Sequence, residues 1–324
     1  MYPLFTRGRI RLCYLAAVLL ALSSAASAQD GLPTSTSDSN VGYIDRATVG
    51  SMLRLRFDAA YNNTRPDRAE FFYAKCGCFR VLNVDPNAPG PPALETSVDY
   101  QAIQADLEYA LTDGFSAFIE APIRFINPEQ GDNTTGLSDL QAGFKIALWA
   151  CEHRAVTFQF RTYIPTGDAD RGLGTDHVSL EPALLWLQRV SDRLSIEAEL
   201  RDWIPIDGSS GLGTGSPGEG FSGNIVRYGV GLGYDLADDC RYRLTPIAEV
   251  VGWTVLDGFA TVTSDGTLAT LSVPEVDGDT IVNVKIGARL TFGNGDSLYA
   301  GYGRALSGDT WYDDVLRIEY RTAF

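Results

Sequence analysis

Two residues of this 324-residue chain have the types and the spacing that nucleophilic catalysis could use. His177 and Ser179 stand two positions apart in the stretch TDHVSLE, so on a strand their side chains would share one face. A serine hydroxyl becomes a nucleophile when a neighbouring histidine accepts its proton and a third group orients that histidine. Glu181 has the same parity, which indicates an inward-facing polar set instead. We therefore keep an acyl hydrolase as an alternative and do not expect an enzyme.

The acidic loop before this pair lacks the pattern of a metal site. The stretch GDADRGLGTD contains Asp168, Asp170 and Asp176. A calcium loop of the type D-x-D-x-D-G would need an acid at position 172, where this chain has Gly172. We therefore expect no metal ion and no cofactor.

The cysteines beyond residue 28 also lack the spacing of a zinc site. A single glycine separates Cys76 from Cys78, which is too close for a relaxed ordinary disulfide. An oxidising compartment nevertheless permits disulfides in general. We expect structural or incidental roles for Cys76, Cys78, Cys151 and Cys240.

The first 28 residues have the composition of an export signal. Three arginines precede the apolar run 14–22, and Ala26 and Ala28 form an A-x-A cleavage site. The apolar run is far shorter than the ~20 residues that a membrane-spanning helix needs. We therefore expect a cleaved signal peptide over 1–28. The polar, turn-rich residues 29–50 are expected to form a flexible periplasmic lead-in.

Beyond residue 50, apolar and polar residues alternate over successive short stretches, which is the pattern of β-strands. In FSAFIEAPIRF, for example, Ile119 and Ile123 share one face while Glu120 and Arg124 share the other. Twelve such strands are expected, at 51–61, 98–111, 115–125, 140–148, 156–164, 179–189, 194–206, 226–234, 242–255, 282–292, 298–306 and 312–324.

The connections between these strands alternate in length. Short ones, such as 112–114 and 190–193, follow long ones, such as 62–97 and 207–224. Outer-membrane barrels show this alternation, with short periplasmic turns and long external loops. We therefore predict an all-β, antiparallel, transmembrane up-and-down β-barrel of about 12 strands over 51–324. Its expected location is the outer membrane of a double-membraned bacterium.

The last strand carries a further signal, because the chain ends on an aromatic residue. Leu316, Ile318, Tyr320 and Phe324 share one face, which resembles the terminal signal read by the barrel-assembly machinery. Other aromatic residues are expected in girdles at the two membrane interfaces, because they fall near strand ends. These residues are Tyr61, Phe115, Phe125, Trp149, Trp186, Trp203, Tyr234, Trp253, Phe292, Trp311 and Phe324.

If the apolar faces meet lipid, the charged faces line the interior. The candidates for the lumen are Arg54, Arg56, Asp58, Asp106, Glu108, Glu120, Arg124, Lys145, Arg161, Glu197, Glu199, Arg201, Arg227, Glu249, Lys285, Arg289, Arg317 and Glu319. We expect a basic wall and an acidic wall to face each other. The basic wall consists of Arg54, Arg56, Arg124, Arg161 and Arg317, and the acidic wall contains Glu197, Glu199 and Glu249. Such a lumen is either a narrow polar channel or an interior closed by ion pairs.

Two stretches resemble a known family. GLSDLQAGFKIAL (136–148) and YIPTGDADRGLGTDHVSLEPALL (163–185) are similar to bacterial outer-membrane proteins named for the MetA pathway of phenol degradation. The matching residues are Gly136, Leu137, Ser138, Asp139, Leu140, Pro165, Thr166, Gly167, Asp168, Gly172, Gly174 and Thr175. The resemblance implies a transporter barrel and supplies no catalytic residue.

The leading functional hypothesis is a channel that passes small solutes, aromatic or hydrophobic ones among them, through a narrow charged lumen. Two alternatives stay open. One is an acyl hydrolase, because outer-membrane phospholipases also carry a His-x-Ser pair, although the longer phospholipase signature is missing here. The other is a closed structural or adhesive barrel. The expected partners are outer-membrane lipid, the assembly machinery and a small solute. The net charge of −15 argues against nucleic acid.

Overall fold

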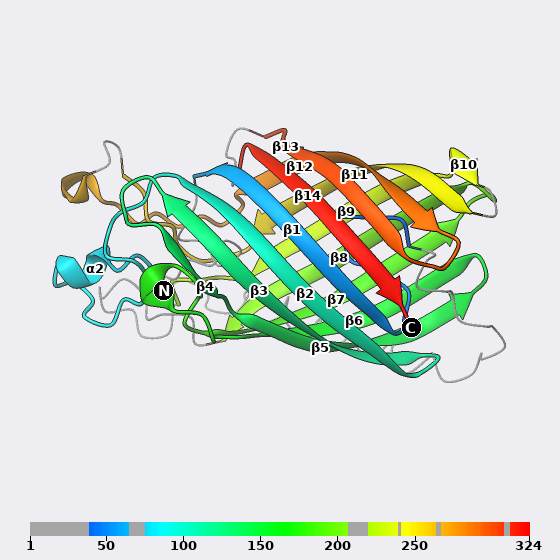
Figure 1. Cartoon of the computed structure of the whole chain (residues 1–324). Helices are drawn as coiled ribbons and strands as arrows, with labels where there is room; N and C mark the ends of the chain where they lie inside the picture. The colour runs from blue at the N-terminus through cyan, green and yellow to red at the C-terminus, as the bar shows by residue number, and fades with distance from the viewer. Residues whose placement is uncertain (1–38, 65–74, 207–219, 239–240, 264–266, 308–311) are drawn as a thin grey trace, which may run out of the picture.

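Twelve antiparallel strands close into a barrel in the computed structural model, which describes residues 39–64, 75–206, 220–238, 241–263, 267–307 and 312–324 (Figure 1). In pairing order they are β1 (Met52–Asn63), β2 (Val98–Thr112), β3 (Phe115–Pro128), β5 (Leu140–Cys151), β6 (Arg154–Ile164), β7 (Val178–Arg189), β8 (Leu194–Ile206), β9 (Ile225–Tyr234), β11 (Tyr242–Val255), β12 (Thr280–Phe292), β13 (Ser297–Ala305) and β14 (Asp314–Ala323). β14 pairs with β1 and closes the ring. Two short strands, β4 (Thr134–Leu137) and β10 (Ala237–Asp238), extend β3 and β11. The predicted twelve-stranded barrel is confirmed.

The strands turn their apolar side chains outward and their polar side chains inward. On β2, Ile103 and Leu107 are each 45% exposed, whereas Gln104, Asp106 and Glu108 are buried. A water-soluble protein has the opposite arrangement, because burying apolar groups stabilises its core. The inversion fits a barrel whose outer surface meets hydrocarbon. Among the described residues, no helix is long and apolar enough to span a membrane.

The two ends of the barrel differ, as the alternating connections predict. Short turns join β2 to β3, β5 to β6 and β12 to β13. The helix α2 (Cys78–Val81) and the strand β4 lie at the opposite end from the chain's C-terminus (Figure 1). The 3-10 helices η3 (Ala169–Arg171) and η4 (Leu268–Thr270) belong to long connections as well.

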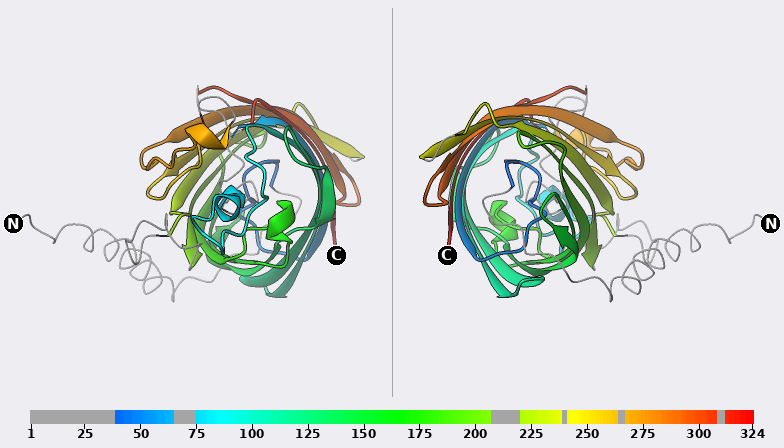
Figure 2. Two further views of the ribbon diagram at one scale, coloured as in Figure 1. Left: turned by 90° about the vertical axis from the view of Figure 1, so that its left-hand side faces the viewer. Right: turned by 90° about the vertical axis from the view of Figure 1, so that its right-hand side faces the viewer.

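Two of the long connections pack together into a small apolar cap. Cys76, Cys78 and Phe79 around α2 are buried with Ala88 and Leu94. Partly buried side chains from the η4 connection, Leu268, Leu271 and Val273, pack on this cluster. A salt bridge of 2.6 Å between Arg80 and Asp170 also links α2 to η3. Figure 2 shows α2 and η3 over the mouth of the barrel.

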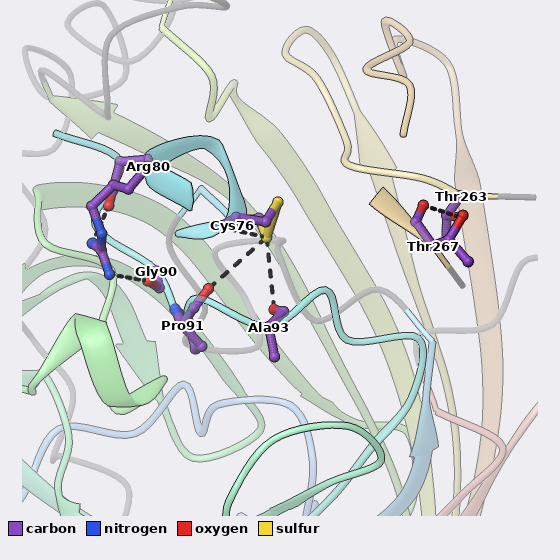
Figure 3. The surroundings of a disulfide bond; sticks show 9 residues. Cys76, Arg80, Gly90, Pro91, Ala93, Thr263 and Thr267 are labelled. Atoms are coloured by element: carbon purple, nitrogen blue, oxygen red, sulfur yellow. Dashed lines mark hydrogen bonds between the residues drawn. A yellow bond between two sulfur atoms is a disulfide. The ribbon is translucent and has the colours of Figure 1, made fainter. Parts of the chain in front are cut away.

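A disulfide between Cys76 and Cys78 lies inside this cap, so the two residues are bridged although a single glycine separates them. Their Cα atoms are 5.2 Å apart. The sulfur of Cys76 lies 3.7 Å from the carbonyl oxygen of Ala93, and Arg80 donates to the carbonyl of Gly90 (Figure 3). Cys151 is a free thiol, and Cys240 lies outside the described residues.

The expectation of a flexible periplasmic lead-in is wrong for residues 39–50. This segment enters the barrel and lies against its inner wall, with Val41, Tyr43 and Ile44 all buried (Figure 2). Its polar, turn-rich sequence indicated solvation, but its polar backbone groups bond to lumen side chains instead. The predicted signal peptide and residues 29–38 lie outside the described residues.

The inverted faces lead to a prediction about stability. Val230 lies mid-strand on β9, and its side chain is 50% exposed on the outer surface. Replacing it by arginine would place a cation in hydrocarbon, so Val230→Arg is expected to lower the free energy of unfolding by ~2–4 kcal/mol. Denaturant unfolding of the barrel in lipid vesicles measures this change, with Val230→Leu as the control. An arginine variant as stable as the leucine variant would contradict the outward assignment.

Candidate binding site in the barrel lumen

Residues 39–48, the lumen segment, cross the barrel interior against a part of the wall where glycines replace larger residues. Gly229 and Gly231 of β9 lie beneath this lumen segment. A Cβ atom at Gly229 would stand 2.5 Å from Cγ2 of Ile44, and one at Gly231 would stand 2.7 Å from Cγ1 of Val41. Both distances are far below van der Waals contact, so only glycine allows the segment to pass this close.

Carboxylates of the wall accept hydrogen bonds from the amides of the lumen segment. Three glutamates on β8 and β11 supply these acceptors. The bonds join Asn40 N to Glu197 (2.8 Å), Tyr43 N to Glu249 (3.0 Å), Ile44 N to Glu249 (3.1 Å) and Asp45 N to Glu199 (2.8 Å). A charged acceptor makes each bond stronger than one between neutral groups.

Basic side chains of the wall bind the carbonyls of the same segment. Most of these donors lie on β12 and β14. The bonds join Arg289 to the carbonyls of Asn40 (2.9 Å) and Val41 (2.7 Å), Arg321 to Val41 (2.8 Å), Arg317 to Gly42 (2.7 Å), Arg227 to Tyr43 (2.8 Å) and Lys145 to Arg46 (3.3 Å). The wall of the lumen thus binds both the amides and the carbonyls of this peptide segment. Its peptide dipoles therefore lie between carboxylates on one side and cations on the other.

Asp45 is the main charged anchor of the lumen segment. Its carboxylate lies 2.8 Å from Arg161 of β6, 3.0 Å from Arg201 of β8 and 4.0 Å from Arg54 of β1. Glu181 bridges Arg161 and Arg201 from the other side, at 3.0 and 2.9 Å. This one carboxylate, which is only 12% exposed, therefore connects strands that lie on different parts of the wall.

The predicted separation into a basic and an acidic wall holds only in part. Arg201 and Arg227 stand beside Glu199 on the side that was expected to be acidic. Arg54 pairs with Glu120 at 3.0 Å, and Arg317 makes a bidentate pair with Asp58 at 2.7 and 2.8 Å. Opposite charges pair with near neighbours instead of separating onto two walls, because removing the partner of a buried charge costs about 3–5 kcal/mol.

The predicted lumen residues all lie on the inner face. Fourteen are buried, namely Arg54, Asp58, Asp106, Glu108, Glu120, Lys145, Arg161, Glu197, Glu199, Arg201, Glu249, Lys285, Arg289 and Glu319. Four are partly exposed and line a cavity, namely Arg56, Arg124, Arg227 and Arg317. The four residues of the expected assembly signal do not line the lumen. Leu316, Ile318 and Phe324 are exposed, and Tyr320 is half-buried.

A cavity of about 190 Å³ lies inside the barrel beside the lumen segment. Seven basic side chains line it: Arg56, Arg124, Arg161, Arg201, Arg227, Lys285 and Arg317. Five acidic side chains also line it: Asp45, Asp58, Glu120, Asp139 and Glu181. Its aromatic lining consists of Tyr43, Tyr100, Tyr163, Trp203, Trp253 and Tyr312.

The cavity corrects the expectation for two aromatic residues. Trp203 and Trp253 were assigned to the interfacial girdles, but both are buried and line the cavity. The sequence does contain the signal that identifies them. Trp203 has the same parity as Glu199 on β8, and Trp253 has the same parity as Glu249 on β11, so each shares a face with a lumen glutamate.

The His177–Ser179 pair is assembled on the inner side of the barrel. Oγ of Ser179 lies 3.1 Å from Nδ1 of His177, and both residues are buried. Burial lowers the pKa of His177, so the ring is neutral at pH 7 and can accept a proton. Its Nε2 atom has no hydrogen-bond partner among the described residues, so the orienting third group of a catalytic triad is missing there.

The nearby carboxylate of Asp139 holds the loop before β7 in place. It accepts hydrogen bonds from the amide of Gly167 (3.0 Å) and from the amide and hydroxyl of Thr175 (both 2.9 Å). Thr166 also donates to the carbonyl of Ser138 at 3.0 Å. These contacts join the two motifs that carried the family resemblance. The motifs therefore encode one tertiary contact, between the start of β5 and the loop before β7.

This contact predicts how the loop responds to substitution. Asp139→Asn replaces one acceptor oxygen by an amide group that faces a donor, at a cost of ~1–3 kcal/mol. Cleavage by trypsin after the exposed Arg171 should then become roughly tenfold faster, because the loop opens more often. Asp176→Asn, on an exposed side chain of the same loop, is the control. Equal cleavage of both variants would show that Asp139 does not hold the loop.

Comparisons with known proteins agree with this architecture. The model of the family named for the MetA-pathway of phenol degradation matches residues 77–201. An outer membrane channel from Pseudomonas putida F1 has a similar structure, with a TM-score of 0.52 at 16% identity over 89% of this chain and 100% of the other. The NanC and KdgM porins match with TM-scores of 0.45 and 0.42 at 8% and 9% identity, each over 84% of this chain and over 98% and 99% of their own. No curated protein matches the sequence. The resemblance seen in the two motifs is confirmed, and the chain is an outer-membrane-type β-barrel that carries the signature of the MetA-pathway family over residues 77–201.

Proposed function

We propose that this protein is an outer-membrane channel that passes small solutes, with aromatic or hydrophobic ones among them. The main observation in support of this proposal is the cavity inside the barrel, whose lining combines charged groups with six aromatic rings. Residues 39–48 lie beside it and narrow the passage. Export by a signal peptide that is cleaved after residue 28 is part of the same proposal.

The lumen segment sets the width of the proposed path. It is held against the wall by hydrogen bonds to charged side chains, and it continues along the chain into β1. A passage this narrow admits ions and small molecules and excludes large ones, because 12 strands enclose less space than the 16–18 strands of open porins. The many fixed charges along it favour dependence of the conductance on salt.

Removing the segment should widen the path. A variant that lacks residues 40–48 is expected to show a single-channel conductance several-fold above that of the full chain. The double variant Glu197→Gln, Glu249→Gln keeps the length but weakens the bonds to the amides, so it should open intermittently. Recording in a planar bilayer measures both, and Glu152→Gln in an exposed turn is the control.

The outcomes of this recording separate the channel from a closed barrel. If neither the full chain nor the deletion variant conducts, the packed-lumen alternative holds and the channel proposal falls. Unchanged conductance on deletion would show that the segment does not lie on the path.

A specific contact also keeps the acyl hydrolase as a second candidate. Ser179 is within hydrogen-bond distance of a neutral His177, and its side chain lines the cavity. A reactive serine would be labelled by a fluorophosphonate probe, and Ser179→Ala would abolish that label. Absence of labelling in the folded wild-type barrel would remove this candidate.

A further inference from the structure

The cavity contains one buried cation that is surrounded by aromatic rings. Lys285 of β12 is 3% exposed, and its ammonium lies 3.9 Å from the ring centroid of Tyr43. The rings of Tyr312 and Trp253 follow at 5.3 and 5.5 Å. The ammonium donates a hydrogen bond of 2.7 Å to the hydroxyl of Tyr312. Rings stabilise a cation through their negative faces, but they do not neutralise it.

Lys285 differs in this respect from the two other lysines of the chain. Lys75 pairs with Asp85 at 2.8 Å, and Lys145 pairs with Glu108 at 3.0 Å. In the described part of the chain, no Asp or Glu forms an ion pair with Lys285. A buried cation without a counter-ion is costly, and an anion that binds beside it would remove that cost.

The acids around Lys285 are already engaged. Glu249 stands opposite it in the register of β11 and β12, but accepts the amides of Tyr43 and Ile44. Asp58 is bound by Arg317. Both Arg317 and Arg227 add positive charge near the ammonium. These two arginines have carboxylate partners of their own, Asp58 and Glu199, whereas Lys285 has no such ion pair within the described part of the chain.

The composition of the whole cavity points to the same kind of ligand. Seven Arg and Lys side chains and five Asp and Glu side chains line it, so it is positive in a chain whose net charge is −15. Its volume of about 190 Å³ exceeds the ~150 Å³ cavity in which another protein binds benzene. Trp203, Trp253 and Tyr312 supply flat apolar surface beside the charge.

We propose that the cavity binds a small aromatic carboxylate, with the carboxylate on Lys285 and the ring against the aromatic lining. This inference rests on the proposed channel function, since it names the class of solute that the path would select. Benzoate is the simplest member of the class. An anion without a ring would use Lys285 alone, and an uncharged ring would leave the ammonium without a counter-ion.

Isothermal titration of the purified full-length barrel in a neutral detergent tests the proposal. Benzoate should bind, and benzyl alcohol and acetate should each bind about tenfold more weakly or worse, because each lacks one of the two contacts. Lys285→Met should weaken benzoate about tenfold or more, whereas Lys285→Arg should stay within a few-fold of wild type. Arg193→Met removes a cation from an exposed turn and should leave binding unchanged.

Equal binding of benzoate to wild type and Lys285→Met would overturn the site. If Lys285→Met does not assemble, the comparison of benzoate with benzyl alcohol and acetate on the wild-type barrel decides alone, and equal affinities overturn the proposal. Planar-bilayer recording of the same preparation separates the two proposals. A barrel that conducts but does not bind benzoate refutes only this inference. A barrel that binds benzoate through Lys285 but never conducts refutes only the channel.

Discussion

Pairing of every polar backbone group is the constraint on which the whole structure depends. In hydrocarbon no water replaces a missing hydrogen bond, so a sheet that spans the membrane must have no free edge. The pairing of β14 with β1 meets this condition for the barrel. The lumen segment meets the same condition differently: it has no neighbouring strand, and its amides and carbonyls bond to glutamates and arginines instead.

The charges of the lumen follow from that arrangement. A wall that must satisfy both the amides and the carbonyls of a peptide needs acceptors and donors at fixed positions. Carboxylates and guanidinium groups supply them, and their mutual pairing removes most of the cost of burial. Asp45 belongs to the segment and pairs with Arg161 and Arg201 of the wall. The lumen is therefore a connected set of ion pairs with one cavity left beside it.

Much of the fold could be predicted from the sequence, because the period of two in a strand is a local property. All twelve strands and the inward direction of residues such as Glu120 and Arg289 follow from parity alone. Parity would also have placed Trp203 and Trp253 in the lumen, but their position near strand ends suggested a girdle. The place of residues 39–50 could not be predicted, since it depends on partners more than 100 residues away. The same holds for Asp139, whose loop contacts appear only when the motifs are brought together.

The separation along the chain between the lumen segment and its partners has a consequence for the order of assembly. Asn40 bonds to Glu197 across 157 residues and to Arg289 across 249, and Val41 bonds to Arg321 across 280. Residues 39–48 leave the ribosome before every strand of the barrel, yet their last partner lies on β14, the final strand. Contacts of such high sequence separation form slowly, because a long loop must close before they can be made. The earliest described part of the chain to be synthesised therefore cannot complete its bonds until the barrel's final strand has been added.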